Sequence, residues 1–172
     1  MLKVQAGDLN KMGLLYERHK SDLFAYFYRN TNNRTVSEDL VQNTFIRLIN
    51  SRQQFKGTGQ FAYWMYHIAR NTWIDNYRKK DPIMKASNIE DSNLKNEWES
   101  NEDDNKEVYK KQLEFALQQL NEEKREAIIL SRYHGMTYKT IAEICDCTEN
   151  TVKSRVMRGI KEIKQILKEK RA

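Results

Sequence analysis

Near its carboxyl end the chain carries hydrogen-bond donors, positive charge and one apolar contact on what would be one side of a helix. The residues are Lys153, Ser154, Met157, Arg158 and Lys161. Such groups can meet base edges and phosphates in the major groove of a DNA duplex. The opposite side of the same helix is predicted to be a narrow apolar stripe that packs on a core. Its members are Val152, Val156, Ile160, Ile163 and Leu167.

The segment before this helix would position it. Residues 138–145 predict a short helix, and Thr137 stands where an N-cap is expected. A tight turn follows at residues 146–148, where Asp146 tolerates a left-handed backbone and Thr148 caps the next helix. A basic face alone is usually only a solvated surface. Two capped helices joined by a tight turn instead favour a helix-turn-helix.

The most aromatic stretch, Phe61 to Lys79, offers a second kind of chemistry. Its rings alternate with amides, histidine and arginine, a mixture that can stack and hydrogen-bond unpaired bases. Some rings must instead belong to a core, and Trp64, Ile68 and Ile74 are the expected core residues. The loop before this helix, Phe55 to Gln60, contains two glycines. Core and base platform remain open alternatives for this segment.

The remaining pattern predicts further helices. Residues 9–29 form the first, with Leu14, Leu15, Leu23, Phe24, Phe27 and Tyr28 on its buried side. Residues 37–49 form the second, capped by Thr35 or Ser37. Its apolar residues exceed one stripe, which indicates deep burial or a docking face for a protein. From residue 108 four more helices are expected, with Gly135 ending the one before the helix-turn-helix.

Composition and charge indicate the organisation. One proline, six glycines and long helical periodicity predict an all-α protein. Residues 1–80 hold 13 basic and 6 acidic side chains, residues 81–107 hold 3 and 9, and residues 108–172 hold 14 and 9. We therefore expect two small helical domains, 1–80 and 108–172, joined by a flexible acidic linker, 81–107. Two basic blocks suggest two polyanion-binding modules.

The sequence offers no pattern typical of an enzyme, a cofactor site or a small-molecule site. The three histidines lie in different segments, and phosphate-binding glycine loops and nucleophile elbows are missing. Cys145 and Cys147 near His134 could suggest zinc, but a fourth ligand is lacking, so reduced structural thiols are expected. No signal peptide or membrane-spanning run is seen in the sequence, which favours a cytoplasmic location.

Taken together, the segments resemble the extracytoplasmic-function (ECF) class of bacterial RNA polymerase sigma factors. The resemblance covers nearly the whole chain in order. Its most specific pieces are DLVQNTFIRL (39–48), FAYWMYHIARNTWIDNYRK (61–79) and TYKTIAEICDCTENTVKSRVMRG (137–159). It implies a subunit that binds core polymerase, directs it to promoters and assists strand opening without catalysing a reaction. A free-standing helix-turn-helix regulator with a helical sensor domain is the alternative, but it needs neither of the first two pieces.

The resemblance also implies roles for individual residues. Docking on the clamp helices of the largest polymerase subunit would involve Asp39, Leu40, Gln42, Phe45 and Leu48. Capture of the nontemplate minus-ten strand would involve Phe55, Lys56, Tyr66, Arg70, Asn71, Asp75 and Arg78. Contacts with the minus-thirty-five duplex would involve Thr148, Thr151, Lys153, Ser154, Met157 and Arg158. An anti-sigma factor is a further expected partner.

The chain departs from the family pattern at two places. His67 stands where the family usually has arginine, and residues 145–147 replace a more usual Leu-Gly-hydrophobic turn. These departures bear on the preferred promoter sequence rather than on the kind of function.

Overall fold

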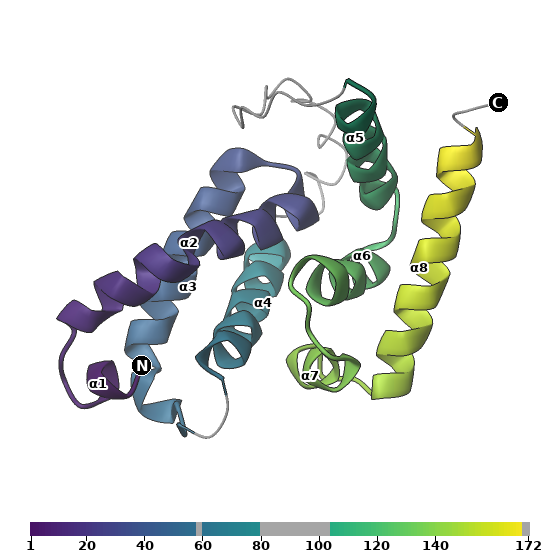
Figure 1. Cartoon of the computed structure of the whole chain (residues 1–172). Helices are drawn as coiled ribbons and strands as arrows, with labels where there is room; N and C mark the ends of the chain where they lie inside the picture. Colours follow the sequence, from purple (N-terminus) through teal and green to yellow (C-terminus); the bar gives the residue numbers. More distant parts are fainter. Residues whose placement is uncertain (58–59, 80–103, 170–172) are drawn as a thin grey trace.

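The computed structural model describes residues 1–57, 60–79 and 104–169, and within these ranges all regular structure is helical. The N-terminal bundle comprises α1 (Leu2–Gln5), α2 (Asn10–Thr31), α3 (Arg34–Asn50), the short turn η1 (Arg52–Gln54) and α4 (Phe61–Lys79). Helix α3 packs against both α2 and α4 (Figure 1). The expectation of an all-α fold is confirmed for the described residues.

The C-terminal bundle comprises α5 (Asp104–Gln118), α6 (Glu122–Ile128), the wide turn η3 (Ile129–Tyr133), α7 (Tyr138–Ile144) and α8 (Glu149–Glu169). The long helix α8 packs against α5, α6 and α7, and it forms the right edge of the molecule in Figure 1. The predicted linker lies largely outside the described residues, but its last residues, from Asp104, begin α5.

Hydrogen bonds at the helix ends explain where several helices begin. Asn33 caps α3, because its side chain accepts from the amide of Val36 at 3.0 Å. The predicted caps Thr35 and Ser37 lie inside the helix instead, and the Ser37 hydroxyl donates to the carbonyl of Asn33. An asparagine side chain one residue before the helix satisfies an orphan amide as well as serine or threonine does. The cap prediction was therefore wrong by a few residues.

The caps of the helix-turn-helix were predicted correctly. Thr137 accepts from the amide of Thr140, and Thr148 accepts from the amide of Thr151, both at 3.2 Å. Asp146 adopts the left-handed conformation, with φ of 50°. A single residue in this conformation ends α7 sharply and lets the chain start α8 in a new direction.

The two bundles dock on one another rather than standing apart. Helix α4 lies against α7, while α2 lies against α5, α6 and η3. The buried apolar residues accordingly form one continuous cluster that runs through both bundles. The cluster includes Leu23 and Leu40 of the N-terminal bundle as well as Ile129 and Ile141 of the C-terminal bundle.

The core of α2 and α4 differs in part from the prediction. Leu14 is 65% exposed, whereas Tyr26, which was not predicted to be buried, is fully buried. In α4 the buried apolar residues include Met65, Ala69 and Trp73, while Trp64, Ile68 and Ile74 are only half-buried. Each of these helices is covered on two sides, so a pattern with one apolar stripe does not describe it.

A single glycine sets how closely α6 and α8 approach. A Cβ atom added at Gly159 would lie 2.6 Å from Cδ1 of Ile128 and 3.4 Å from Cβ of Lys124. The 2.6 Å contact is shorter than real Cβ atoms show, so a larger residue at position 159 would force the Ile128 side chain, or α8 itself, to move. The close packing fixes α8 with its opposite face turned outward.

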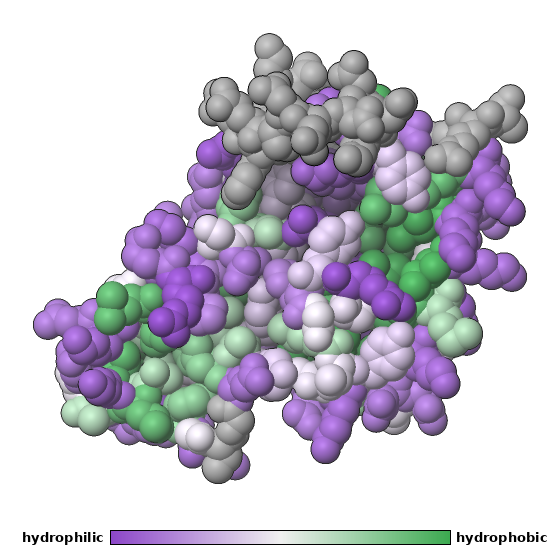
Figure 2. Space-filling model, viewed as in Figure 1, coloured by the Kyte–Doolittle hydropathy of each residue, from purple (hydrophilic) through white to green (hydrophobic). Residues whose placement is uncertain are grey.

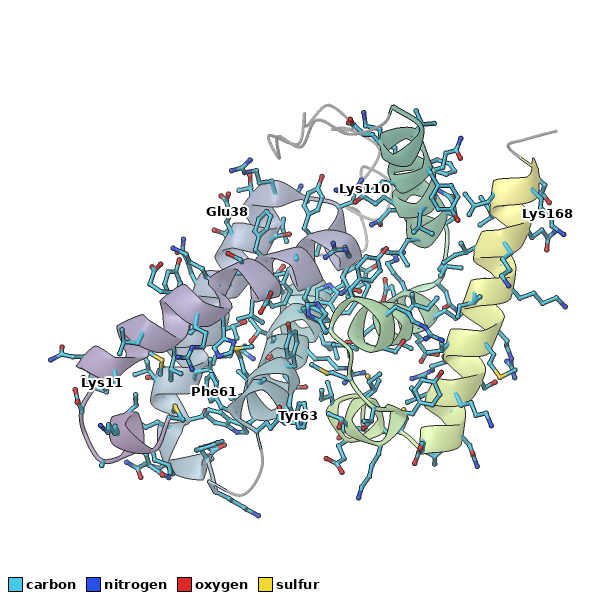
Figure 3. All side chains as sticks on the ribbon, viewed as in Figure 1. Lys11, Glu38, Phe61, Tyr63, Lys110 and Lys168 are labelled. Carbon is cyan, nitrogen blue, oxygen red and sulfur yellow. The ribbon has the colours of Figure 1, made fainter. Side chains whose placement is uncertain are left out.

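Many charged side chains are exposed on the surface. In Figure 3 Lys11, Glu38, Lys110 and Lys168 point away from the helices that carry them. Figure 2 shows a face with many hydrophilic residues and two hydrophobic areas, one between α5 and α8 and one at the lower left, near α1. None of the described helices is long and apolar enough to cross a membrane.

Candidate nucleic-acid interface

The outer face of α8 is the more exposed of the two candidate nucleic-acid surfaces. Lys153, Met157 and Arg158 are exposed, with Met157 at 62%. Thr151 and Ser154 beside them are half-buried, and the Thr148 hydroxyl lies 2.8 Å from that of Thr151. All six residues predicted to contact the minus-thirty-five element therefore lie on α8 or at its cap. They present donors, two cations and one apolar side chain to solvent.

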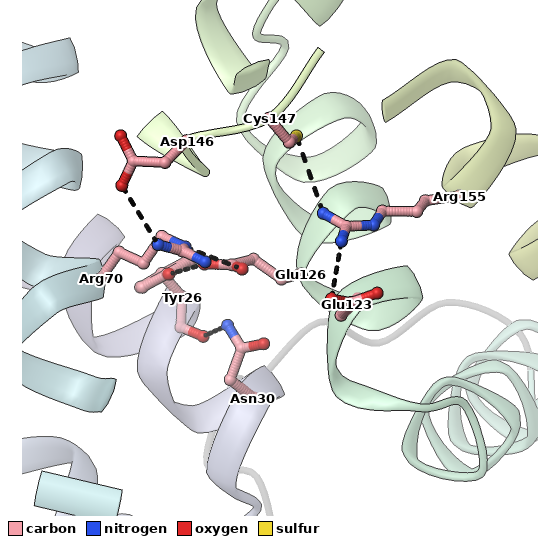
Figure 4. Close-up of polar contacts among 8 residues, drawn as sticks. All are labelled: Tyr26, Asn30, Arg70, Glu123, Glu126, Asp146, Cys147 and Arg155. Carbon is pink, nitrogen blue, oxygen red and sulfur yellow. Dashed lines mark hydrogen bonds and ion pairs between the residues drawn. The ribbon is translucent and has the colours of Figure 1, made fainter. Parts of the chain in front are cut away.

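A groove of about 460 Å³ continues this face toward α6. It adds Arg155, which was not predicted as a site residue. The Arg155 guanidinium lies 2.6 Å from a carboxylate oxygen of Glu123 and 3.7 Å from the sulfur of Cys147 (Figure 4). Arg155 lies four residues after Thr151 and therefore on the same side of the helix, so the sequence could have indicated it as a site residue. The groove is lined by Asn121, Glu123, Lys124, Asn150, Thr151, Ser154, Arg155 and Arg158.

The second candidate surface surrounds the start of α4. Phe55 is 8% exposed, and its ring packs on Phe61 and Trp64, with centroid distances of 6.1 and 5.3 Å. Lys56 is exposed next to it. Asn71 lies further along α4 and is half-buried. Phe55 thus anchors the loop to α4, while the lysine and the amide remain within reach of a ligand.

Two predicted minus-ten residues point into the contact between the bundles instead of toward solvent. Tyr66 is 4% exposed, and its hydroxyl lies 2.8 Å from Nδ1 of His134. Burial, with the nearby Arg29 cation, lowers the pKa of His134 to about 4, so this imidazole is neutral at neutral pH. Burial also raises the pKa of the Tyr66 phenol, which stays protonated. Tyr66 and His134 form a neutral pair between α4 and the end of η3.

Arg70 belongs to a buried ionic cluster that joins three helices. The Glu126 side chain on α6 is 7% exposed, and its oxygens accept from the Tyr26 hydroxyl at 2.7 Å and from Nε of Arg70 at 3.2 Å (Figure 4). Asp146 lies 3.9 Å from the Arg70 guanidinium. Burial opposes the charged form of Arg70, but the Glu126 carboxylate, together with Cys145 and Tyr26, raises the pKa of Arg70. Burial and Glu126 together hold the pKa of Tyr26 well above its usual range.

The two remaining predicted minus-ten residues lie near the carboxyl end of α4. Asp75 pairs with Arg47 of α3 at 2.7 Å, and both side chains are more than a third exposed. The side chain of Arg78 lies outside the described residues. The structure therefore separates the predicted set: Lys56 is exposed and Asn71 half-buried, while Tyr66 and Arg70 contact the C-terminal bundle.

The predicted docking residues of α3 divide in the same way. Asp39 and Gln42 are exposed, whereas Leu40, Phe45 and Leu48 are at most 5% exposed and belong to the core. The excess of apolar residues on α3 is thus mostly deep burial, one of the two alternatives. The exposed apolar residue of α3 is Ile46, at 55%, which was not among the predicted contacts. It lies four residues after Gln42, on the same side of the helix.

The cysteines form no metal centre with their described neighbours. Cys145 is buried, which raises the pKa of its thiol, and Cys147 is half-buried. His134 is engaged with Tyr66 through Nδ1. Among the described residues, no three histidine, cysteine or carboxylate side chains lie close enough together to hold a metal ion.

Comparison with known families defines the class of protein. Residues 15–83 match the family model for Sigma-70 region 2, and residues 110–163 match that for Sigma-70, region 4. The chain is 31% identical over 167 residues to the ECF RNA polymerase sigma-E factor of Salmonella typhimurium, covering 91% of this chain and 86% of that protein. The chain belongs to the ECF sigma factors, which are transcription initiation factors and not enzymes.

Other relatives agree with this assignment. The ECF RNA polymerase sigma-E factor of Haemophilus influenzae is 29% identical over 167 residues, covering 91% of this chain and 87% of the relative. A solved structure, the sigma factor RpoE in complex with the anti-sigma factor NepR from Bartonella quintana, has a TM-score of 0.75 at 26% identity. It covers 91% of this chain and 96% of that one. The fold of the chain is thus that of a sigma factor over nearly its whole length.

Proposed function

We propose that this chain binds core RNA polymerase, directs it to specific promoters and assists promoter melting. The observation that carries the proposal is the occurrence of region 2 and region 4 in order on one chain. Because a duplex-binding regulator needs only a helix-turn-helix, the region 2 match disfavours the free-standing regulator. The proposed site of action is the cytoplasm, where the polymerase transcribes.

Region 4 would recognise the minus-thirty-five duplex through α8. Gly159 holds α8 against α6, so its cationic face is turned outward with Lys153 and Arg158 exposed. The groove beside them adds Arg155, whose partner Glu123 holds the guanidinium at the edge of that face. Cations at both sites suit contacts with phosphates as well as bases.

Region 2 would supply the polymerase contact and the single-strand contact. For polymerase we propose the exposed side of α3, with Asp39, Gln42 and Ile46, while the buried Leu40, Phe45 and Leu48 hold that side in place. For the nontemplate strand we propose Lys56 and Asn71, joined by Tyr66 and Arg70 once these are released from the C-terminal bundle. An anti-sigma factor is the proposed regulator, as in the complex of RpoE with NepR.

The direct test is transcription by core RNA polymerase with and without the purified chain, followed by sequencing of the transcripts. A sigma factor should produce new transcripts with defined starts, and their upstream sequences should share minus-ten and minus-thirty-five elements. A helix-turn-helix regulator would change transcription only when another sigma factor is present. If adding this chain to core polymerase produces no new transcription start sites, the proposal is refuted.

A further inference from the structure

The contact between the bundles uses side chains that the proposed function needs elsewhere. Tyr66 and Arg70 belong to the single-strand surface proposed for region 2, yet Tyr66 is buried against region 4 and Arg70 is half-buried in an ion pair with it. A side chain that accepts a partner in this contact cannot present the same atoms to a nucleotide. The docked arrangement and binding of the minus-ten strand by these residues are therefore mutually exclusive.

Glu126 is the centre of the polar contact. Both of its carboxylate oxygens are used by the other bundle: one accepts from Tyr26 and the other from Arg70 (Figure 4). A buried carboxylate is tolerated only with partners of this kind, so the three side chains depend on one another. Asp146, in the turn of the helix-turn-helix, adds a second negative charge beside Arg70.

The contact extends along α2 and α4 beyond this cluster. His134 meets Tyr66 at 2.8 Å, and the Gln118 amide donates to the carbonyl of Arg29 at 2.8 Å. Arg125 donates to the carbonyl of Asn30 at 2.7 Å. Each of these bonds joins one bundle to the other, so they would be lost together when the bundles separate.

We propose that this contact is an autoinhibitory latch, in which Glu126 holds Tyr26 and Arg70 and keeps the free chain closed. Opening the latch would release Arg70 and Tyr66 for the minus-ten strand and free region 4 to reach a separate element on the same promoter. The inference rests on the proposed function and concerns its regulation. The effect of the latch is to lower the affinity of the free chain for single-stranded DNA.

The test compares two latch variants with a matched control. Glu126→Gln removes the charge that holds Arg70, and Tyr26→Phe removes one hydrogen bond while keeping the ring. Glu143→Gln makes the same change of charge on the exposed side of α7. Neither Tyr26 nor Glu126 belongs to the proposed DNA surface, so a gain in affinity cannot come from a better direct contact. The control separates opening of the latch from the added positive charge.

Two measurements on the free 172-residue chain, without polymerase, test whether the latch opens. The first is the distance between fluorophores at Asn43→Cys and Lys164→Cys, both exposed positions, in a Cys147→Ser background. The second is the affinity for a single-stranded oligonucleotide from the nontemplate strand of a promoter that the wild-type chain transcribes with core polymerase. Glu126→Gln should lengthen the distance and raise the affinity about tenfold, as expected for the loss of a charge-assisted hydrogen bond. Tyr26→Phe should act in the same direction but less, and Glu143→Gln should leave both readouts unchanged.

Three results would overturn the latch. They are an unchanged distance in Glu126→Gln, a longer distance without higher affinity, and an equal rise in affinity in Glu143→Gln. Failure of the proposed function would look different, because the wild-type chain would then yield no promoter-specific transcripts with core polymerase. The latch readouts can be interpreted once that transcription has been observed.

Discussion

At the scale of single residues, we expect two exposed residues of α8 to bind different parts of the DNA, Arg158 a base and Lys153 a phosphate. If Arg158 makes a bidentate contact with a base, Arg158→Ala should cost about 1–3 kcal/mol of binding free energy and relax the preference at one base position. Lys153→Ala should instead weaken binding to all duplexes and reduce the salt dependence by about one counterion. Titration of a minus-thirty-five duplex at several salt concentrations measures both effects. Lys168→Ala, near the far end of α8, is the control, and an Arg158 variant with wild-type affinity and specificity would exclude that contact.

Asn71 makes a comparable prediction for the single strand. An amide can donate and accept at once, so it suits the edge of an unpaired base. We expect Asn71→Ala to keep the melting temperature and minus-thirty-five binding but to give a smaller promoter bubble in permanganate footprints of the holoenzyme. Asn50→Ala, exposed at the end of α3, serves as the control. A variant that melts earlier yet opens promoters normally would mean that Asn71 is structural.

The predictions for single residues were correct where the structure depends on residues that are close in the sequence. Thr137, Thr148 and Asp146 were correct because capping and left-handed backbone depend on neighbours in the chain. The surroundings of Tyr26 and Arg70 could not be predicted, because Tyr26 lies 100 residues and Arg70 lies 56 residues from Glu126 in the sequence. Leu14 was misplaced because a helix in contact with several neighbours has no single buried stripe.

At the scale of elements, Gly159 sets the approach of α6 and α8. Gly159→Ala should destabilise the chain, because overpacking costs about 1–3 kcal/mol and the higher helix propensity of alanine offsets only about 1 kcal/mol. Gly13 in α2 is the matched control, since nothing lies within 4 Å of an added Cβ and alanine there should stabilise. Urea unfolding measures both variants. Adding Ile128→Val, which removes the clashing methyl group, should restore part of the loss, and a Gly159→Ala chain as stable as wild type would contradict the packing argument.

We expect substitutions on the exposed side and on the buried side of α3 to affect polymerase binding differently. Gln42→Ala should weaken copurification with core polymerase without lowering the melting temperature, because Gln42 is exposed. Phe45→Ala removes a core residue whose ring meets Tyr16 at 4.9 Å, and such truncations cost about 3–5 kcal/mol of stability. Phe45→Ala is therefore a test of folding rather than of docking. Undiminished copurification of both Gln42→Ala and Ile46→Ala would remove this side of α3 from the interface.

Element boundaries were predictable where breakers and caps are strong. The bounds of α4 and the start of α7 match the prediction, and α2 differs by one or two residues at each end. The helix expected up to Tyr133 was found, but its last part widens into η3, where the amide of His134 donates to the carbonyl of Ile129. Such a widening follows from packing, which an apolar pattern does not contain.

At the scale of the whole molecule, docking of the bundles should depend on pH through His134. Its pKa is about 4 when the bundles are docked, against 6.5 for an unperturbed histidine, with Arg29 and Asp22 the nearby charges. Stability from this site is present above pH 6.5 and is lost as pH falls toward 4, because the open or unfolded chain binds the extra proton. The melting temperature of the wild-type chain should therefore fall between about pH 7.5 and about pH 5.

The variant His134→Gln isolates this effect. Its side chain does not titrate, so its melting temperature should fall less than that of the wild type over the same range of pH. Burial also lowers the pKa of His19, and the variant retains that contribution. Parallel pH profiles for wild type and variant would show that His134 is not responsible.

The sequence pattern predicted two helical bundles, but it did not predict how they dock on one another. Helical periodicity reports which side of a helix is buried, but it does not report which other helix covers it. The side chains that form the contact, such as Tyr66 and Arg70, were interpreted as ligand contacts because aromatic and cationic residues serve both purposes. The structure brings them to Glu126 and His134, and their role then depends on the arrangement of the whole chain.

The wide turn η3 has a consequence for how the gene can vary in length. One residue of an α-helix rotates the following side chains by about 100°, and a π-type turn accommodates one residue more than an α-turn would. A one-codon deletion within Ile129–Tyr133 could therefore be absorbed as an ordinary helical turn, with the helix left continuous. His134 would then rotate away from Tyr66. Among related genes, a difference of a single codon at this point would mark chains whose two halves are held together differently.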